Sequence, residues 1–179
     1  MPTSLTLPPT RPFQSEYPQT ETYFITLCTH DRECLFGEIV GGKMCLNDLG
    51  RLIAEEWQKS FDICSDFDLH HWVIMPNHIH GIVGATEHHD TSTVQCSTPR
   101  ASTTVRSHSL SQWITHFKEI ATQRIKPLRK RSHQPLWQQE VDQQIIPHRF
   151  AFHTFRQYIT TNPHAWDWDK LHPDSPAFS

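Results

Sequence analysis

The chain has 179 residues and a mass of 20.9 kDa, the size of one domain with terminal extensions. Its net charge of −3 argues at first sight against a nucleic-acid-binding protein, because such proteins usually carry a basic excess. No apolar run approaches the roughly 20 residues of a membrane span, and the five cysteines form no Cys-x-x-Cys pair. These features exclude a membrane protein and a disulfide framework, and they indicate reduced thiols in the cytoplasm.

The first part of the chain predicts two strands and a helix after a proline-rich segment, residues 1–20, that we expect to be a disordered lead-in. Residues 23–28 are rich in β-formers and predict the first strand. A short strand is expected over 35–40, before a glycine pair that favours a turn. A helix over 47–60 comes next, because its apolar side chains recur at helical spacing and one of its first two residues can cap it.

The middle of the chain predicts a β-hairpin and then a long connector. Residues 67–75 and 78–83 predict two strands, and Pro76 and Asn77 between them favour a tight turn. Residues 84–108 are rich in Ser and Thr and show no periodicity, so we expect a flexible connector inside the domain.

The last part predicts two helices with a short strand between them. Ser109 can cap a helix that ends near residue 125, and a basic loop over 126–135 comes next. Residues 141–146 predict a short extended piece, and a final helix is expected over 148–161, before Pro163.

Apart from the short strand over 35–40, the order of these elements is strand, helix, two strands, helix, strand, helix. It suits an α+β fold in which an antiparallel sheet has helices on one face. We expect a single domain over residues 21–169, with 170–179 as a tail.

Charge is concentrated in one segment of the chain. Residues 1–99 carry a net charge of −8, residues 100–135 carry +7 and residues 136–179 carry −2. A basic segment on an acidic chain is a candidate contact for a polyanion, and a solvated helix end is the alternative interpretation. Its candidate DNA-binding residues are Lys118, Arg124, Lys126, Arg129, Lys130 and Arg131.

His78 and His80 form a His-x-His pair on a predicted strand. Residues two apart on a strand point to the same face, with their Cα atoms roughly 6.5–7 Å apart. Two imidazoles at that separation can converge on one metal ion. The alternative is that both are ordinary histidines of the core or the surface.

Tyr158 and Asn162 are four residues apart on the last predicted helix, so their side chains share one helical face. The pattern alone also allows a half-buried core tyrosine and an asparagine that caps the end of the helix before Pro163.

Two motifs make a family resemblance specific. Residues 73–81, VIMPNHIHG, look like the HUH signature of single-tyrosine transposases. Residues 158–163, YITTNP, with Trp166 shortly after them, resemble the Tyr-x-x-x-Asn-Pro-x-x-Trp pattern of the REP-associated tyrosine transposases. Smaller agreements occur at residues 29–37, 117–118 and 136–138. The likeness runs from about Tyr23 to Asp169, with the motifs in the family's order.

The resemblance implies a ferredoxin-like or RRM-like antiparallel sheet, with the His pair on a central strand and a tyrosine-bearing helix after it. It implies that His78, His80 and Asn162 bind Mg²⁺ or Mn²⁺ and that Tyr158 is the nucleophile. The implied activity is cleavage and rejoining of hairpin-bearing single-stranded DNA through a 5′-phosphotyrosine. The implied setting is the bacterial cytoplasm, associated with the nucleoid, as a monomer or homodimer.

Further expectations concern DNA contacts. The basic segment would track the phosphates, and four tryptophans are candidates for stacking on bases, namely Trp113, Trp137, Trp166 and Trp168. Of these, Trp113 stands at helical spacing among apolar residues and is expected in the core instead. After Trp137 this chain has two glutamines where the family usually has Gln-Arg, so a phosphate contact is missing there. Two other functions remain as alternatives: a catalytically quiet DNA-hairpin-binding protein of the same fold, and a zinc hydrolase that uses the His pair.

Overall fold

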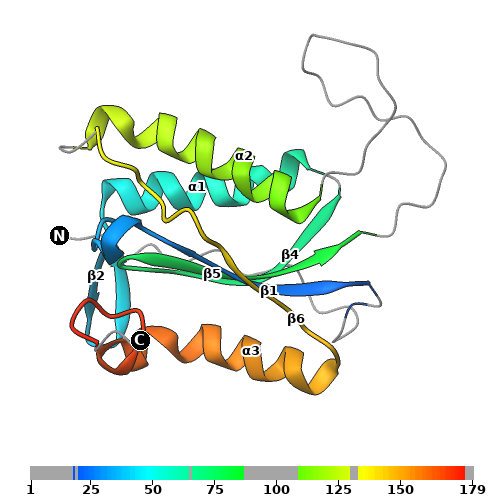
Figure 1. Cartoon of the computed structure of the whole chain (residues 1–179). Helices are drawn as coiled ribbons and strands as arrows, with labels where there is room; N and C mark the ends of the chain where they lie inside the picture. Colours follow the sequence, from blue (N-terminus) through cyan, green and yellow to red (C-terminus); the bar gives the residue numbers. More distant parts are fainter. Residues whose placement is uncertain (1–17, 19, 65, 87–108, 130–132, 176–179) are drawn as a thin grey trace, which may run out of the picture.

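The computed structural model of the chain is shown in Figure 1. It describes residue 18 and the ranges 20–64, 66–86, 109–129 and 133–175. Most of the expected lead-in and of the expected connector therefore lie outside the described residues, as do Lys130 and Arg131. No helix in the described part of the chain is long and apolar enough to cross a membrane.

A four-stranded antiparallel sheet forms the centre of the molecule, in the order β4-β5-β1-β6. Its strands are β1 (Thr22–Cys28), β4 (Phe67–Met75), β5 (His78–Ala85) and β6 (Asp142–Ile145). One helix lies between β1 and β4 along the chain and another between β5 and β6. A β-α-β-β-α-β chain with this strand order is the ferredoxin-like arrangement, so the expected fold class is confirmed.

Helices cover both faces of this sheet (Figure 1). Helices α1 (Asp48–Ile63) and α2 (Leu110–Ile125) pack on one face, as expected. Helix α3 (Arg149–Thr161), which carries the tyrosine, packs on the opposite face. Because strand side chains alternate, β5 sends Ile79 into the α1–α2 core and His78, His80 and Ile82 towards α3.

The caps of these helices agree with the sequence. The Asn47 side chain accepts a hydrogen bond from the Gly50 N–H and so begins α1. Ser109 and Gln112 form a reciprocal capping box at the start of α2. The α-helical part of α3 ends at Thr161, before Pro163, and the chain continues as a 3-10 helix, η3 (Asn162–Trp168).

A two-stranded hairpin lies beside the main sheet. It consists of β2 (Gly37–Val40) and β3 (Lys43–Leu46), joined by Gly41 and Gly42 in left-handed conformations. The short strand expected over 35–40 is therefore present, together with a partner strand that we did not expect. A short 3-10 turn, η1 (His30–Arg32), lies between β1 and this hairpin along the chain.

Candidate active site

His78 and His80 point from β5 towards α3, and both are buried, with 0% and 1% of their surface exposed. Their ring centroids lie 4.4 Å apart. The Nε2 atom of each ring is buried and has no hydrogen-bond partner among the described residues. A buried polar atom without a partner costs free energy, so this pair is suited to an external partner such as a metal ion.

The other ring nitrogens are held by neighbouring side chains. The Nδ1 atom of His78 lies 2.8 Å from Asn77 Oδ1, and the Nδ1 atom of His80 lies 3.0 Å from Thr26 Oγ1. An amide oxygen can only accept, so His78 donates from Nδ1 and its Nε2 carries the lone pair. Such hydrogen bonds orient a metal-binding histidine and set its tautomer.

Asn162 is the first residue of η3 and lies beside His78. Only 1% of its surface is exposed. Its Nδ2 atom donates to Asp169 Oδ2 at 2.7 Å, while its Oδ1 atom is buried without a hydrogen bond to the described residues. A carboxylate only accepts hydrogen bonds, so Asp169 fixes which end of the amide faces it. The amide oxygen of Asn162 is thereby left available as a ligand.

Asp169 is a member of the site that the sequence did not predict. Its carboxylate lies within 4.8 Å of ligand nitrogens of both His78 and His80, and all three residues are buried. The three form a His-His-Asp group that could hold a metal ion. In the sequence, Asp169 looks the same as Asp167 two residues earlier, which is exposed, so only the fold distinguishes the two.

The electrostatics keep both imidazoles neutral at neutral pH. Burial lowers the pKa of His78 to about 4, against a smaller opposing effect of the Asp169 carboxylate. Burial, and after it the proximity of His78, moves the pKa of His80 well below its usual range. Neutral imidazole is the form that binds metals, so the site is ready to bind an ion without first losing protons.

Tyr158 lies on α3 beside the same polar atoms. Its ring centroid is 5.2 Å from that of His80, and 37% of the residue is exposed, so solvent reaches it. Burial, then the charge of Asp169, raise the pKa of Tyr158 to about 12, while Asn162 opposes the rise. The phenol is therefore protonated at neutral pH, and the site needs an added positive charge to favour the phenolate.

The donors gathered here suit a divalent cation. Two imidazole nitrogens, one amide oxygen and one carboxylate oxygen come from β5, η3 and the residue after η3. Imidazole nitrogens together with amide and carboxylate oxygens form a donor set that a divalent cation can accept.

Known proteins similar to this chain were found by sequence and by structure. No family model matches the chain. Over 159 residues, the chain is 32% identical to an uncharacterized protein of Haemophilus influenzae, and the match covers 85% of each of the two proteins. The chain belongs to the same family as that protein.

A solved structure of a REP-associated tyrosine transposase bound to a REP hairpin matches 90% of this chain and 77% of its own, with a TM-score of 0.56 and 18% identity. The chain has the fold of a REP-associated tyrosine transposase. The resemblance inferred from residues 73–81 and 158–166 is thus confirmed for the fold. In this transposase fold, the motif residues His78, His80, Tyr158 and Asn162 come together in one place.

Two of the arginines expected to contact DNA are instead engaged within the transposase fold. Arg124 on α2 forms ion pairs with Glu55 and Glu56 on α1. Arg129 is buried and donates hydrogen bonds to the carbonyl oxygens of Gln134 and Pro135. Arg129 is thereby held inside the fold, whereas the Arg124 side chain is 34% exposed, and a DNA contact of either arginine stays a prediction.

The remaining candidate DNA-binding residues differ in their surroundings. Lys118 donates a hydrogen bond of 2.7 Å to the Gln138 carbonyl, which joins α2 to the segment before β6. Trp137 is buried and packs against Phe36 and Phe117 in the core, so it cannot stack on a base. Lys126 is exposed and remains a candidate, whereas the structure does not describe Lys130 and Arg131.

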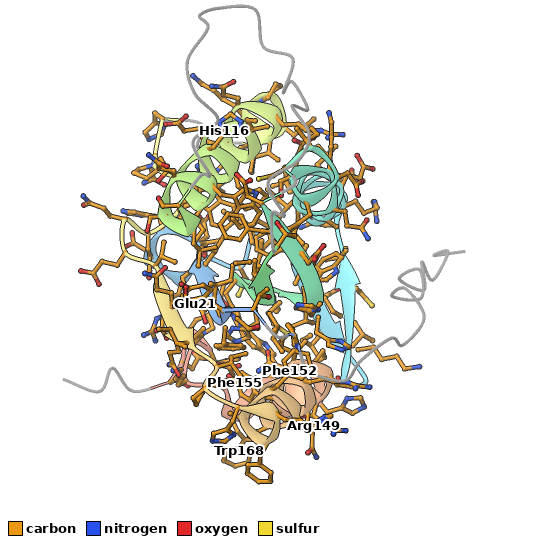
Figure 2. The ribbon with its side chains drawn as sticks, turned by 90° about the vertical axis from the view of Figure 1, so that its right-hand side faces the viewer. Glu21, His116, Arg149, Phe152, Phe155 and Trp168 are labelled. Atoms are coloured by element: carbon orange, nitrogen blue, oxygen red, sulfur yellow. The ribbon has the colours of Figure 1, made fainter. Side chains whose placement is uncertain are left out.

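Of the four candidate stacking tryptophans, three are buried, namely Trp113, Trp137 and Trp166. Trp166 lies next to the site, because its ring centroid is 6.0 Å from that of His78. Trp168 is 90% exposed. Figure 2 shows Phe152 and Phe155 on the side of α3 that faces the sheet, and Trp168 projecting outward into solvent.

Proposed function

We propose that this protein is a metal-dependent transposase and endonuclease that cleaves and rejoins hairpin-bearing single-stranded DNA through a 5′-phosphotyrosine. One observation carries the proposal. Three buried potential ligand atoms, His78 Nε2, His80 Nε2 and Asn162 Oδ1, make no hydrogen bond of ordinary geometry with the described residues. A solvent-accessible tyrosine, Tyr158, lies against the His80 ring. A site that had lost its function would not need to keep such unpaired polar atoms.

In this proposal, His78, His80, Asn162 and Asp169 hold Mg²⁺ or Mn²⁺. When bound, the ion supplies Lewis-acid polarisation of a phosphodiester oxygen and favours the phenolate of Tyr158. Asn77 and Thr26 keep the two imidazoles in place through their Nδ1 atoms. Asp169 keeps the Asn162 oxygen turned away from its own carboxylate and available for the ion.

The strand-transfer chemistry assigned to Tyr158 conserves bonds. Its phenolic oxygen bonds to phosphorus, the bond from phosphorus to the 3′ oxygen breaks, and that oxygen leaves as a 3′-hydroxyl after taking up a proton. A second 3′-hydroxyl can then attack the phosphotyrosine, which restores a phosphodiester and releases Tyr158. One bond forms for each bond broken, so rejoining needs no ATP. Trp168, the exposed tryptophan, is the candidate for stacking on an unpaired base.

The test is to incubate the protein with Mn²⁺ and a labelled DNA hairpin that has single-stranded flanks, and then to look for a denaturation-resistant protein–DNA adduct. We expect an adduct with the wild type and none with Tyr158→Phe. Tyr23→Phe is the matched control, because Tyr23 lies on β1 outside the site, and it should form the adduct normally. EDTA should abolish the adduct.

Each alternative gives a different result in the same experiment. Binding of the hairpin without cleavage would indicate a catalytically quiet binding protein. Cleavage without a covalent adduct would indicate a hydrolase. An undiminished adduct with Tyr158→Phe would exclude Tyr158 as the nucleophile.

A further inference from the structure

Two cations lie beside the proposed metal site on segments that the sequence analysis left without a function. We propose that Arg32 and Lys170 form a phosphate-binding subsite that holds the DNA strand next to the phosphodiester to be cleaved. This inference rests on the function proposed above. It assigns phosphate recognition to residues outside the basic segment.

Lys170 lies on a tight turn directly after the buried carboxylate. The Leu171 N–H donates to Asp169 Oδ1 at 2.7 Å, and the His172 N–H donates to the Asp169 carbonyl at 2.9 Å. These bonds make Lys170 the first central residue of a turn. Its exposed side chain therefore starts one residue from a group that lies within 4.8 Å of the His ligand atoms.

Arg32 reaches the same turn from the loop after β1. Its Nη1 atom donates to the Lys170 carbonyl at 3.1 Å. A guanidinium has five N–H donors, and this bond uses one of them. The planar group can present its other donors to phosphate oxygens in pairs, which is the geometry that makes arginine a strong phosphate ligand.

One buried side chain ties these segments to the metal site. The Nδ2 atom of Asn77 donates to the Arg32 carbonyl at 3.0 Å and to the Leu171 carbonyl at 2.8 Å. Its Oδ1 atom accepts a hydrogen bond from His78 Nδ1 at 2.8 Å. Asn77 is 1% exposed, so both cation-bearing segments and His78 are fixed to the same buried amide. The backbones of both segments thus keep a defined position relative to His78.

The backbone at Arg32 supports a specific role. Asp31 and Arg32 both have positive φ angles, 53° and 55°, which non-glycine residues rarely adopt. Strained conformations of this kind persist where the surroundings hold them, and they gather at functional sites. Here the loop is held by Asn77 and by the contact of Arg32 with the 169–172 turn.

The experiment measures binding by fluorescence anisotropy of a labelled DNA hairpin with single-stranded flanks, in EDTA so that no cleavage occurs. Binding is measured over a series of salt concentrations, starting at low salt, where phosphate contacts alone suffice. Lys170→Gln removes an exposed charge and should not affect folding. Lys59→Gln is the matched control, because Lys59 is exposed on α1 on the other face of the sheet.

We expect Lys170→Gln and Arg32→Gln each to reduce the slope of log K against log salt by about 0.7 to 1, the effect of one lost phosphate contact. Arg32→Lys should retain most of the slope. Lys59→Gln should leave it unchanged. A purely structural role of Arg32 would lower the melting temperature without changing the salt slope, and that result would overturn its assignment.

The outcomes separate this inference from the proposed function. Two results with a hairpin-binding wild type would refute the subsite and leave the proposed function standing. One is a Lys170→Gln variant with the wild-type slope of log K against log salt. The other is a Lys59→Gln variant whose slope falls as much as that of Lys170→Gln. If the wild type does not bind the hairpin at any salt concentration, both proposals are wrong.

Discussion

Individual side chains decide what the candidate site can bind, and Asp169 is the most informative of them. Its carboxylate holds the amide of Asn162 and lies within 4.8 Å of the two histidine ligand atoms. Asp169→Asn keeps the size of the side chain and an accepting oxygen, but it removes the negative charge. We expect the affinity for Mn²⁺ to fall by about 10-fold to 100-fold, as for other residues that support a metal site.

This change can be measured without DNA, from the increase in melting temperature that Mn²⁺ causes by binding the folded state. Asp167→Asn is the matched control, because Asp167 is exposed and two residues away. An unchanged response to Mn²⁺ with Asp169→Asn would remove Asp169 from the ligand set.

At this scale the sequence predicted part of the site. The spacing of His78 and His80 on a strand, and of Tyr158 and Asn162 on a helix, predicted which side chains share a face. It did not predict Asp169, because the contact depends on how the chain turns after η3. Nor did it predict the ion pair of Arg124 with Glu56, because the two residues lie 68 positions apart in the sequence.

Among the elements, α1 and the small hairpin depend on a close contact at Gly50. A Cβ atom at this position would lie 2.0 Å from the Phe36 carbonyl oxygen, which also accepts a hydrogen bond from the Asn47 N–H. Helix propensity alone predicts that Gly50→Ala stabilises α1 by about 1 kcal/mol. We expect the opposite, a loss of about 1–3 kcal/mol, because the two backbone segments must move apart.

Chemical denaturation measures this change in the free energy of unfolding. Gln58→Ala, at an exposed position of the same helix, should stay within about 0.5 kcal/mol of the wild type. Equal or greater stability of Gly50→Ala would show that the contact between the hairpin and α1 is not rigid.

Most elements could be predicted because local signals agreed with the fold. The capping residues Asn47 and Ser109 mark the starts of α1 and α2, and Pro76-Asn77 marks the turn between β4 and β5. The strand β3 was missed because residues 43–46 alternate between exposed and half-buried and contribute little apolar burial. The 3-10 helix after Thr161 was also missed, since Pro163 marks the end of an α-helix but does not indicate the conformation of the residues beyond it.

For the whole molecule, the cluster of buried neutral histidines makes stability depend on pH. Burial lowers the pKa of His78 to about 4 and also lowers that of His80, whereas in the unfolded chain both should titrate near about 6.5. As the pH falls below about 6.5, the unfolded chain takes up protons that the folded chain does not, so unfolding becomes more favourable.

We therefore expect the melting temperature of the metal-free protein, measured in EDTA, to fall between about pH 7 and pH 5. In this range few carboxylates titrate, so the histidines dominate the change. A constant melting temperature over this range would contradict the burial of neutral imidazoles. Added Mn²⁺ should raise the melting temperature at about pH 7, because the ion binds the neutral form.

The overall charge also has a different meaning in the folded molecule. The net charge of −3 suggested that the chain does not bind nucleic acid, and the basic segment suggested that it does. In the fold, part of that segment is engaged by Glu55 and Glu56, while Arg32 and Lys170 come together from distant parts of the sequence. Charge counted along the chain could not show either arrangement.

The central claim, that Tyr158 carries the DNA strand, is tested most directly by locating the adduct with mass spectrometry. After reaction with the hairpin and Mn²⁺, trypsin should release residues 157–170, a peptide that follows Arg156, ends at Lys170 and contains one tyrosine, Tyr158. We expect this peptide to carry a 5′-linked nucleotide on Tyr158. A nucleotide on any other peptide, or DNA cleavage with an unmodified 157–170 peptide, would contradict the mechanism.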